Sequence, residues 1–285
     1  MFRSPQLTGA ALMVAAGFCF ALVNTLVQGA TMGRGAASTA VTFWQYLIAL
    51  LLYLPWTWRH RTAVFATKHP YLQVLRVVLG AIGVQFWAYG LAHVEIWQAI
   101  ALILLSPFFV TIGAWAVLRE KVTPARWLAV IVGMIGGAII LEPWSESFTL
   151  YALLPVTAAA FWAASSVVTK HLTHEDTPET ITIYLLLLLT PINGVLGVGT
   201  DIALPTNAIW LVAAAGLATA AAQHALARAY SLADAAFLQP FDHLKLVFNV
   251  TLGFAVFGFA PSGSMWLGAA IIIAASLTLM RLERD

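Results

Sequence analysis

Charged residues are scarce in this sequence. Only 9% of the 285 residues are Asp, Glu, Lys or Arg, against about 25% in soluble domains, whereas 61% are hydrophobic and the mean hydropathy is +0.88. The net charge of +2 is too small to attract nucleic acid. The composition therefore excludes a soluble domain and predicts an integral membrane protein in a lipid bilayer.

Cysteine and the usual catalytic motifs are also nearly absent. Cys19 is the single cysteine, so no disulfide can form within the chain. No Gly-x-Ser-x-Gly or His-Glu-x-x-His motif occurs, and no Gly-rich loop precedes a Lys that could hold a nucleotide phosphate. The group His171, His174, Glu175 and Asp176 fits a solvated turn without metal. We expect no enzyme, cofactor or metal; a substrate gradient or a coupling ion such as a proton would drive any transport.

Long apolar runs fill the chain. A crossing needs about 20 apolar residues, and the sequence has room for ten crossings with short connections. The runs show neither the alternation of an outer-membrane barrel nor the polar face of a soluble helix. The predicted spans are 7–28, 39–58, 71–92, 96–117, 125–142, 149–171, 179–198, 208–229, 235–257 and 264–281.

Lysine and arginine are distributed unevenly between the two ends of these spans. Twelve of the fourteen lie on the side of the N-terminus, Arg34 lies on the other side, and Lys245 lies within a span. Short cytoplasmic loops carry an excess of Lys and Arg. This distribution predicts a multi-pass membrane protein with both termini in the cytoplasm.

Two charged residues interrupt the ninth apolar run. Asp242 and Lys245 are three positions apart, so they share one face of a helix that Gln239 and Asn249 extend. A charge at the bilayer centre costs about 2.5 to 3.5 kcal/mol, so such residues usually meet a partner or a watery cavity. Two readings stay open: the two side chains neutralise each other as a structural pair, or Lys245 receives a substrate carboxylate while Asp242 balances it.

Further polar or aromatic side chains occur at membrane depth in other spans. Each one alone is explained by a hydrogen bond between helices, worth about 0.6 to 2 kcal/mol. Their concentration in a few spans favours a shared substrate cavity. With Asp242 and Lys245, the candidate substrate-binding residues are Asn24, Gln85, Trp162, Ser166, Gln223 and His224.

Two prolines lie inside predicted spans. Pro107 and Pro240 lack a backbone N–H group, which leaves the carbonyl groups of Ile103 and Ala236 without their usual helical partners. Membrane helices tolerate such groups where side chains, other helices or water meet them. We therefore expect spans four and nine to bend at these prolines and to act as hinges.

The two halves of the chain resemble each other. Pro107-Phe-Phe in span four corresponds to Pro240-Phe-Asp in span nine. Because each half contributes five spans, an odd number, the second half enters the membrane from the opposite side. This predicts repeats at 1–145 and 146–285, and inverted repeats with a site near the midplane are typical of alternating-access transporters.

Short motifs occur in both halves of the chain. They are Phe86-Trp-Ala-Tyr-Gly-Leu91, Ser106-Pro107 and Leu118-Arg-Glu120 in the first half, and Gln239-Pro-Phe-Asp242, Phe257-Gly258 and Pro261 in the second. These motifs resemble those of the EamA-type repeats of the drug/metabolite transporter superfamily. The resemblance implies an all-α membrane protein whose ten transmembrane helices form two inverted five-helix repeats around a central cavity. It also implies a carrier of small metabolites in the cell inner membrane, with bacterial amino-acid exporters, including exporters of aromatic amino acids, as the most similar members.

Two positions depart from the family pattern. Phe259 occupies the place in the second half that Glu120 occupies in the first, and Gln45 occupies a place where many members have arginine. We therefore expect a secondary transporter that exports amino acids or similar small metabolites. The alternative is a membrane-embedded enzyme or receptor-like binder that uses the same cavity without translocation.

Overall fold

The structure is a computed structural model that describes residues 5–60, 65–119, 121–146, 148–172, 176–197, 202–233, 238, 241 and 243–284. Every regular element within these residues is helical. The elements are α1 (Pro5–Thr31), α2 (Ser38–His60), α3 (Pro70–Leu91), α4 (Ile96–Ile103), α5 (Ser106–Leu118), α6 (Pro124–Leu141), the short 3-10 helix η2 (Leu150–Ala152), α7 (Leu153–Leu172), α8 (Pro178–Leu196), α9 (Ile209–Leu232), α11 (Leu244–Phe257) and α12 (Gly263–Arg284).

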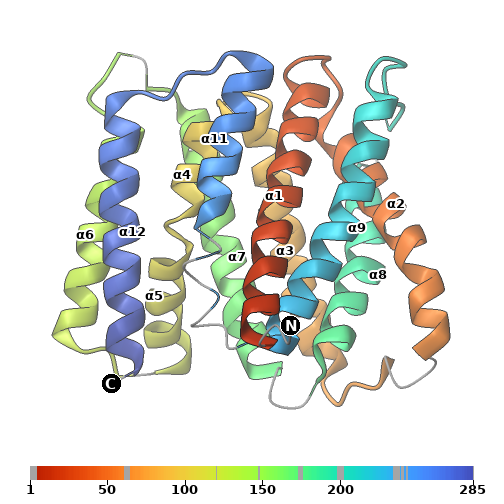
Figure 1. Cartoon of the computed structure of the whole chain (residues 1–285), viewed down its shortest axis with the longest axis horizontal. Coiled ribbons are helices and arrows are strands. Elements are labelled where there is room, and N and C mark those ends of the chain that lie inside the picture. The colour runs from red at the N-terminus through yellow and green to blue at the C-terminus, as the bar shows by residue number, and fades with distance from the viewer. Residues whose placement is uncertain are drawn as a thin grey trace.

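The helices follow the apolar runs of the sequence closely. Within the described residues, seven helical segments are long and apolar enough to cross a membrane, and three shorter apolar helices lie in α8, α11 and α12. Together they account for the ten predicted spans. Helix α1 begins and α12 ends at the same end of the bundle (Figure 1), as an even number of crossings requires.

Threonine followed by proline sets the start of two helices. The Oγ1 atom of Thr123 accepts a hydrogen bond from the N–H of Arg126 at 3.4 Å at the start of α6, and Thr177 does the same for Thr180 at 3.2 Å at the start of α8. A side-chain acceptor satisfies one of the free N–H groups of the first turn, and proline fits the first helical position because it needs no donor there.

The packing of the helices shows the two-repeat arrangement. The most extensive contacts are those of α1 with α9, α3 with α7, and α6 with α12. In an inverted repeat α7 corresponds to α1 and α9 corresponds to α3, so the first two pairs are the same contact made twice. The third pair joins the last helices of the two halves, which lie together at one side of the bundle (Figure 1).

Glycine permits the closest of these contacts. A Cβ atom at Gly136 on α6 would lie 2.9 Å from the carbonyl oxygen of Gly268 on α12, and one at Gly268 would lie 2.6 Å from that of Gly136. Small residues at such crossings let membrane helices approach each other closely. Any larger residue at either position would push α6 and α12 apart.

The outer surface carries large apolar side chains, as expected where lipid replaces water. The aromatic residues nearest the span ends include Trp210, Trp144 and Trp266, which are 81%, 71% and 50% exposed. Tryptophan prefers the boundary between the hydrocarbon and the headgroups. These exposed positions near the span ends fit an interfacial role.

The fourth span is broken where the sequence places a hinge. Helix α4 ends at Ile103 and α5 begins at Ser106, one residue before Pro107. The N–H of Leu105 instead bonds the carbonyl of Leu102 at 3.1 Å. Helix α4 therefore ends before Pro107, whereas the bend and the hinge role of this proline stay predictions. Pro240, the second predicted hinge, lies outside the described residues.

Candidate functional site

An asparagine pair and a tryptophan connect three helices in the interior of the bundle. The indole Nε1 of Trp87 on α3 donates to Oδ1 of Asn24 on α1 at 3.1 Å, and Nδ2 of Asn24 donates to Oδ1 of Asn249 on α11 at 3.0 Å. Asn249 is fully buried and Trp87 is 8% exposed, whereas Asn24 is half-buried. Because an amide presents both donors and an acceptor, this chain of groups can exchange its internal bonds for bonds to a polar ligand.

A second tryptophan lies beside this chain. The ring of Trp162 on α7 has its centroid 5.8 Å from that of Trp87, with 47° between the ring planes. Its Nε1 donates to the carbonyl of Gly80 at 3.2 Å, and the missing side chain of Gly83 makes room for the indole. Asn24, Trp87, Trp162 and Asn249 are called the Asn24 cluster below.

Lys245 lies in the first turn of α11, the helix that supplies Asn249. Its side chain is half-buried, and its Cβ atom would lie 3.7 Å from a Cβ atom at Gly17 on α1. The carbonyl of Lys245 accepts a hydrogen bond from Nδ2 of Asn249 at 2.6 Å. Lys245 therefore lies one helical turn from the Asn24 cluster. Asp242, its predicted neighbour, lies outside the described residues.

Gln85 belongs to a different group of polar side chains. Its Nε2 donates to Oγ1 of Thr42 on α2 at 2.9 Å and to Oδ1 of Asn193 on α8 at 3.1 Å. Asn193 is fully buried, and its Nδ2 has no partner among the described residues. Sequence reasoning missed Thr42 and Asn193, although a polar residue two positions after Pro191 in an apolar run is a signal that could have marked Asn193.

The remaining predicted residues are more dispersed. Gln223 on α9 is half-buried, whereas His224 on α9 and Ser166 on α7 are exposed. The neighbouring Ser165, rather than Ser166, bonds across helices, because its Oγ donates to the carbonyl of Arg76 at 2.9 Å. The structure thus brings Asn24 and Trp162 together around Trp87 and leaves Ser166 and His224 at exposed positions.

A buried charged group that the sequence did not indicate connects the two halves near the start of α3. Arg76 is 4% exposed and donates to the carbonyl of Ile181 at 2.6 Å and to Oε1 of Gln73 at 3.1 Å. Nε2 of Gln73 and Oγ1 of Thr67 each donate to Oδ2 of Asp176 at 2.7 Å. Each charge is therefore hydrogen-bonded, as a buried charge requires, and the group joins α3 to α8.

Comparison with known proteins identifies the family. The model of the EamA-like transporter family matches residues 7–142 and 149–281. The chain is 50% identical over 281 residues to a riboflavin transporter of Rhizobium johnstonii, covering 98% of this chain and 93% of that protein. It is 48% identical over 272 residues to a riboflavin transporter of Vibrio cholerae, covering 94% of this chain and 91% of that protein.

A solved crystal structure also has the same fold. It superposes with a TM-score of 0.63 and 17% sequence identity, covering 99% of this chain and all of that chain. The matched family and the two relatives are transporters and not enzymes, so the chain is a transporter of a small metabolite. Two family matches, ten apolar helical spans and relatives that align over almost the whole length lead to one conclusion: the chain belongs to the EamA-like transporter family.

Proposed function

We propose that this chain carries riboflavin across the membrane. The observation that supports the proposal most strongly is the identity of 50% and 48% to riboflavin transporters over almost the whole chain. Amino-acid export, the prediction from sequence, has no such support and stays a prediction. The other sequence-based alternative, a membrane-embedded enzyme or binder without translocation, is not favoured because the family and these relatives are transporters.

The chemistry of riboflavin suits the Asn24 cluster. Riboflavin combines a flat aromatic ring system, whose polar edge has carbonyl groups and an N–H, with a chain of hydroxyl groups. The rings of Trp87 and Trp162 offer aromatic faces, and stacking of a base on such a face contributes about 1 to 3 kcal/mol. The amides of Asn24 and Asn249 supply both donors and acceptors for a polar edge.

Riboflavin and amino acids differ in charge. Riboflavin carries no carboxylate, so Lys245 has no anionic group of riboflavin to bind. The binding of a substrate carboxylate by Lys245 therefore applies only if the substrate is an amino acid. In the riboflavin proposal, Lys245 instead contributes through its backbone carbonyl, which holds the amide of Asn249.

Flavin fluorescence gives a direct test. Stacking on tryptophan quenches the flavin, so titration of riboflavin with the purified protein should show saturable quenching. Trp162→Leu should weaken binding about tenfold, which is about 1.4 kcal/mol. The matched control is Trp210→Leu, because Trp210 is 81% exposed at the edge of the bundle and should bind riboflavin like the wild type. Absence of saturable quenching in the wild type would contradict the proposal, and displacement of riboflavin by phenylalanine would favour amino-acid export.

A further inference from the structure

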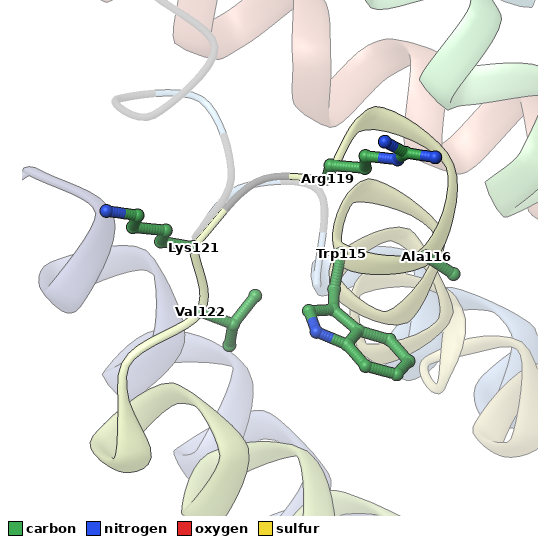
Figure 2. Close-up of a pocket in the computed structure, with 5 residues that line it drawn as sticks. All are labelled: Trp115, Ala116, Arg119, Lys121 and Val122. Atoms are coloured by element: carbon green, nitrogen blue, oxygen red, sulfur yellow. The ribbon is translucent and has the colours of Figure 1, made fainter.

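A pocket of about 600 Å³ lies between the end of α5 and the start of α6, apart from the Asn24 cluster. Trp115, Ala116, Arg119, Lys121 and Val122 line it. Figure 2 shows the side chains of Trp115 and Val122 facing each other, while the two cationic side chains extend to opposite sides of the opening. Ligand sites usually have volumes of about 300 to 1,000 Å³, so this hollow can hold a small headgroup.

Trp115 forms the aromatic wall of the pocket, and its ring is held by a neighbouring ring but remains exposed. Trp115 meets Trp127, on the first turn of α6, in an edge-to-face contact with ring centroids 5.4 Å apart and an interplanar angle of 79°. Trp115 is nevertheless 50% exposed. An indole held in this way offers a firm surface to an occupant of the pocket.

The backbone holds Arg119 in an unusual conformation. Arg119 follows the last residue of α5 with φ of +55°, in the left-handed region where glycine is the usual residue. Gly258, which follows α11 at the corresponding place in the second half, has φ of +73°. The fold therefore requires a left-handed residue at both places. The first half places a cation where the second half has the favoured glycine, which indicates that the arginine side chain itself is needed.

The corresponding place in the second half has no cation. There, Gly258 is followed by Phe259, which stacks on Phe257 with ring centroids 5.2 Å apart. Within the described part of the chain, the structure records no hydrogen bond or ion pair for Arg119 or Lys121. Both side chains are exposed, at the end that the Lys and Arg distribution assigns to the cytoplasm.

An apolar surface leads away from the pocket along α6. Leu128, Ile131 and Ile135 share one helical face and are 62%, 55% and 53% exposed. This face begins beside Trp127, the partner of Trp115. A cationic opening that continues into a lipid-facing apolar stripe suits an occupant with an anionic head and an apolar tail.

We propose that this pocket binds an anionic phospholipid. The anionic headgroup lies in the opening, with Arg119 on one side and Lys121 on the other, the glycerol portion rests on Trp115, and an acyl chain follows Leu128, Ile131 and Ile135. A soluble phosphate would use the two cations but would leave the aromatic wall and the apolar stripe without a role. The headgroup chemistry therefore favours a lipid of the cytoplasmic leaflet, where anionic lipids attract basic residues.

Native mass spectrometry of the purified full-length protein, without riboflavin, tests this proposal. The wild type should bind phosphatidylglycerol more tightly than phosphatidylcholine with the same acyl chains. Each cation contributes about fivefold to binding at an anionic surface, so Arg119→Gln with Lys121→Gln should weaken phosphatidylglycerol binding about 25-fold. The matched control is Lys68→Gln with Arg281→Gln, which removes two exposed cations outside the pocket and should leave the preference intact.

A second variant separates shape from charge. Val122→Trp, at a position whose side chain faces Trp115 (Figure 2), fills the hollow without removing a cation and should also weaken phosphatidylglycerol binding. Equal binding of the two lipids by the wild type, or unchanged binding by both pocket variants, would overturn the proposal. Full displacement of the lipid by glycerol 3-phosphate at the same concentration would also overturn it, in favour of a soluble phosphate.

Discussion

Asn24 and Asn249 are 225 positions apart in the chain, yet Nδ2 of Asn24 lies 3.0 Å from Oδ1 of Asn249. This hydrogen bond joins α1 of the first half to α11 of the second. Trp87 donates to the same Asn24, so α3 is part of the same connection. A ligand that bonds to these amides would therefore act on the contact between the two halves, and in transporters with inverted repeats it is the relative movement of such halves that gives alternating access.

Removal of this asparagine pair should affect riboflavin binding more than stability. Hydrogen bonds between membrane helices contribute about 0.6 kcal/mol on average, so Asn24→Ala and Asn249→Ala should show a coupling of about that size in the free energy of unfolding. Riboflavin affinity should fall about tenfold in each variant. The control is Thr251→Val, because Oγ1 of Thr251 donates within its own helix, to the carbonyl of Val247 at 2.8 Å. Wild-type affinity in both asparagine variants would exclude the pair from the site.

Two glycines of α3 offer a matched test of the position of Trp162. A Cβ atom at Gly83 would lie 2.5 Å from Cδ1 of Trp162, whereas one at Gly80 would meet only Oγ of Ser165 at 3.7 Å. Gly83→Ala should displace the indole and weaken riboflavin binding severalfold, and Gly80→Ala should leave it unchanged. Equal affinities of the two variants, measured by flavin quenching, would show that the position of Trp162 does not matter for binding.

The break before Pro107 should affect transport rate rather than affinity. Pro107→Ala restores the backbone donor and should favour a continuous helix across Leu104 and Leu105, which should slow exchange. Pro55 lies inside α2, which continues past it, so Pro55→Ala is the matched control. Exchange rates in proteoliposomes and equilibrium affinities distinguish the two effects. A Pro107→Ala protein with wild-type turnover would refute the hinge.

Hydrophobicity allowed the sequence to predict most of the fold. The predicted spans and the observed helices agree within a few residues except at the start of span nine, which was predicted at 235, whereas α11 begins at Leu244. The agreement elsewhere arises because lipid-facing and buried surfaces of a membrane bundle are both apolar and breaks between spans are marked by charge, glycine and proline. The bend at Pro107 stays a prediction. The division into repeats at 145 and 146 stays a prediction.

The grouping of the polar residues could not be predicted in the same way. The hydrogen-bond partner of each amide depends on the rotation of its helix about the helix axis. The sequence of an almost uniformly apolar span gives no signal of that rotation. Gln85 therefore joined Thr42 and Asn193 instead of Asn24, and His224 proved exposed. The amino-acid prediction followed from the family resemblance, and the predicted site residues included Asn24 but not its partner Asn249.

A test of the predicted membrane orientation needs a cysteine at a position that is exposed in the structure. Thr67 is half-buried and donates to Asp176, so a cysteine there would be protected by its surroundings on either side of the membrane. Ala66 is exposed and serves better. In a Cys19→Ser background, Ala66→Cys should resist an impermeant thiol reagent in intact cells, whereas Ser262→Cys, exposed at the other end, should react. The opposite pattern would reverse the topology.

Counterflow of riboflavin tests the central claim most directly. The purified protein is placed in liposomes loaded with unlabelled riboflavin, and the entry of labelled riboflavin is followed over time. The account predicts transient accumulation that requires unlabelled riboflavin inside and that phenylalanine inside cannot replace. Accumulation driven by phenylalanine but not by riboflavin, or binding of riboflavin with no exchange, would contradict it.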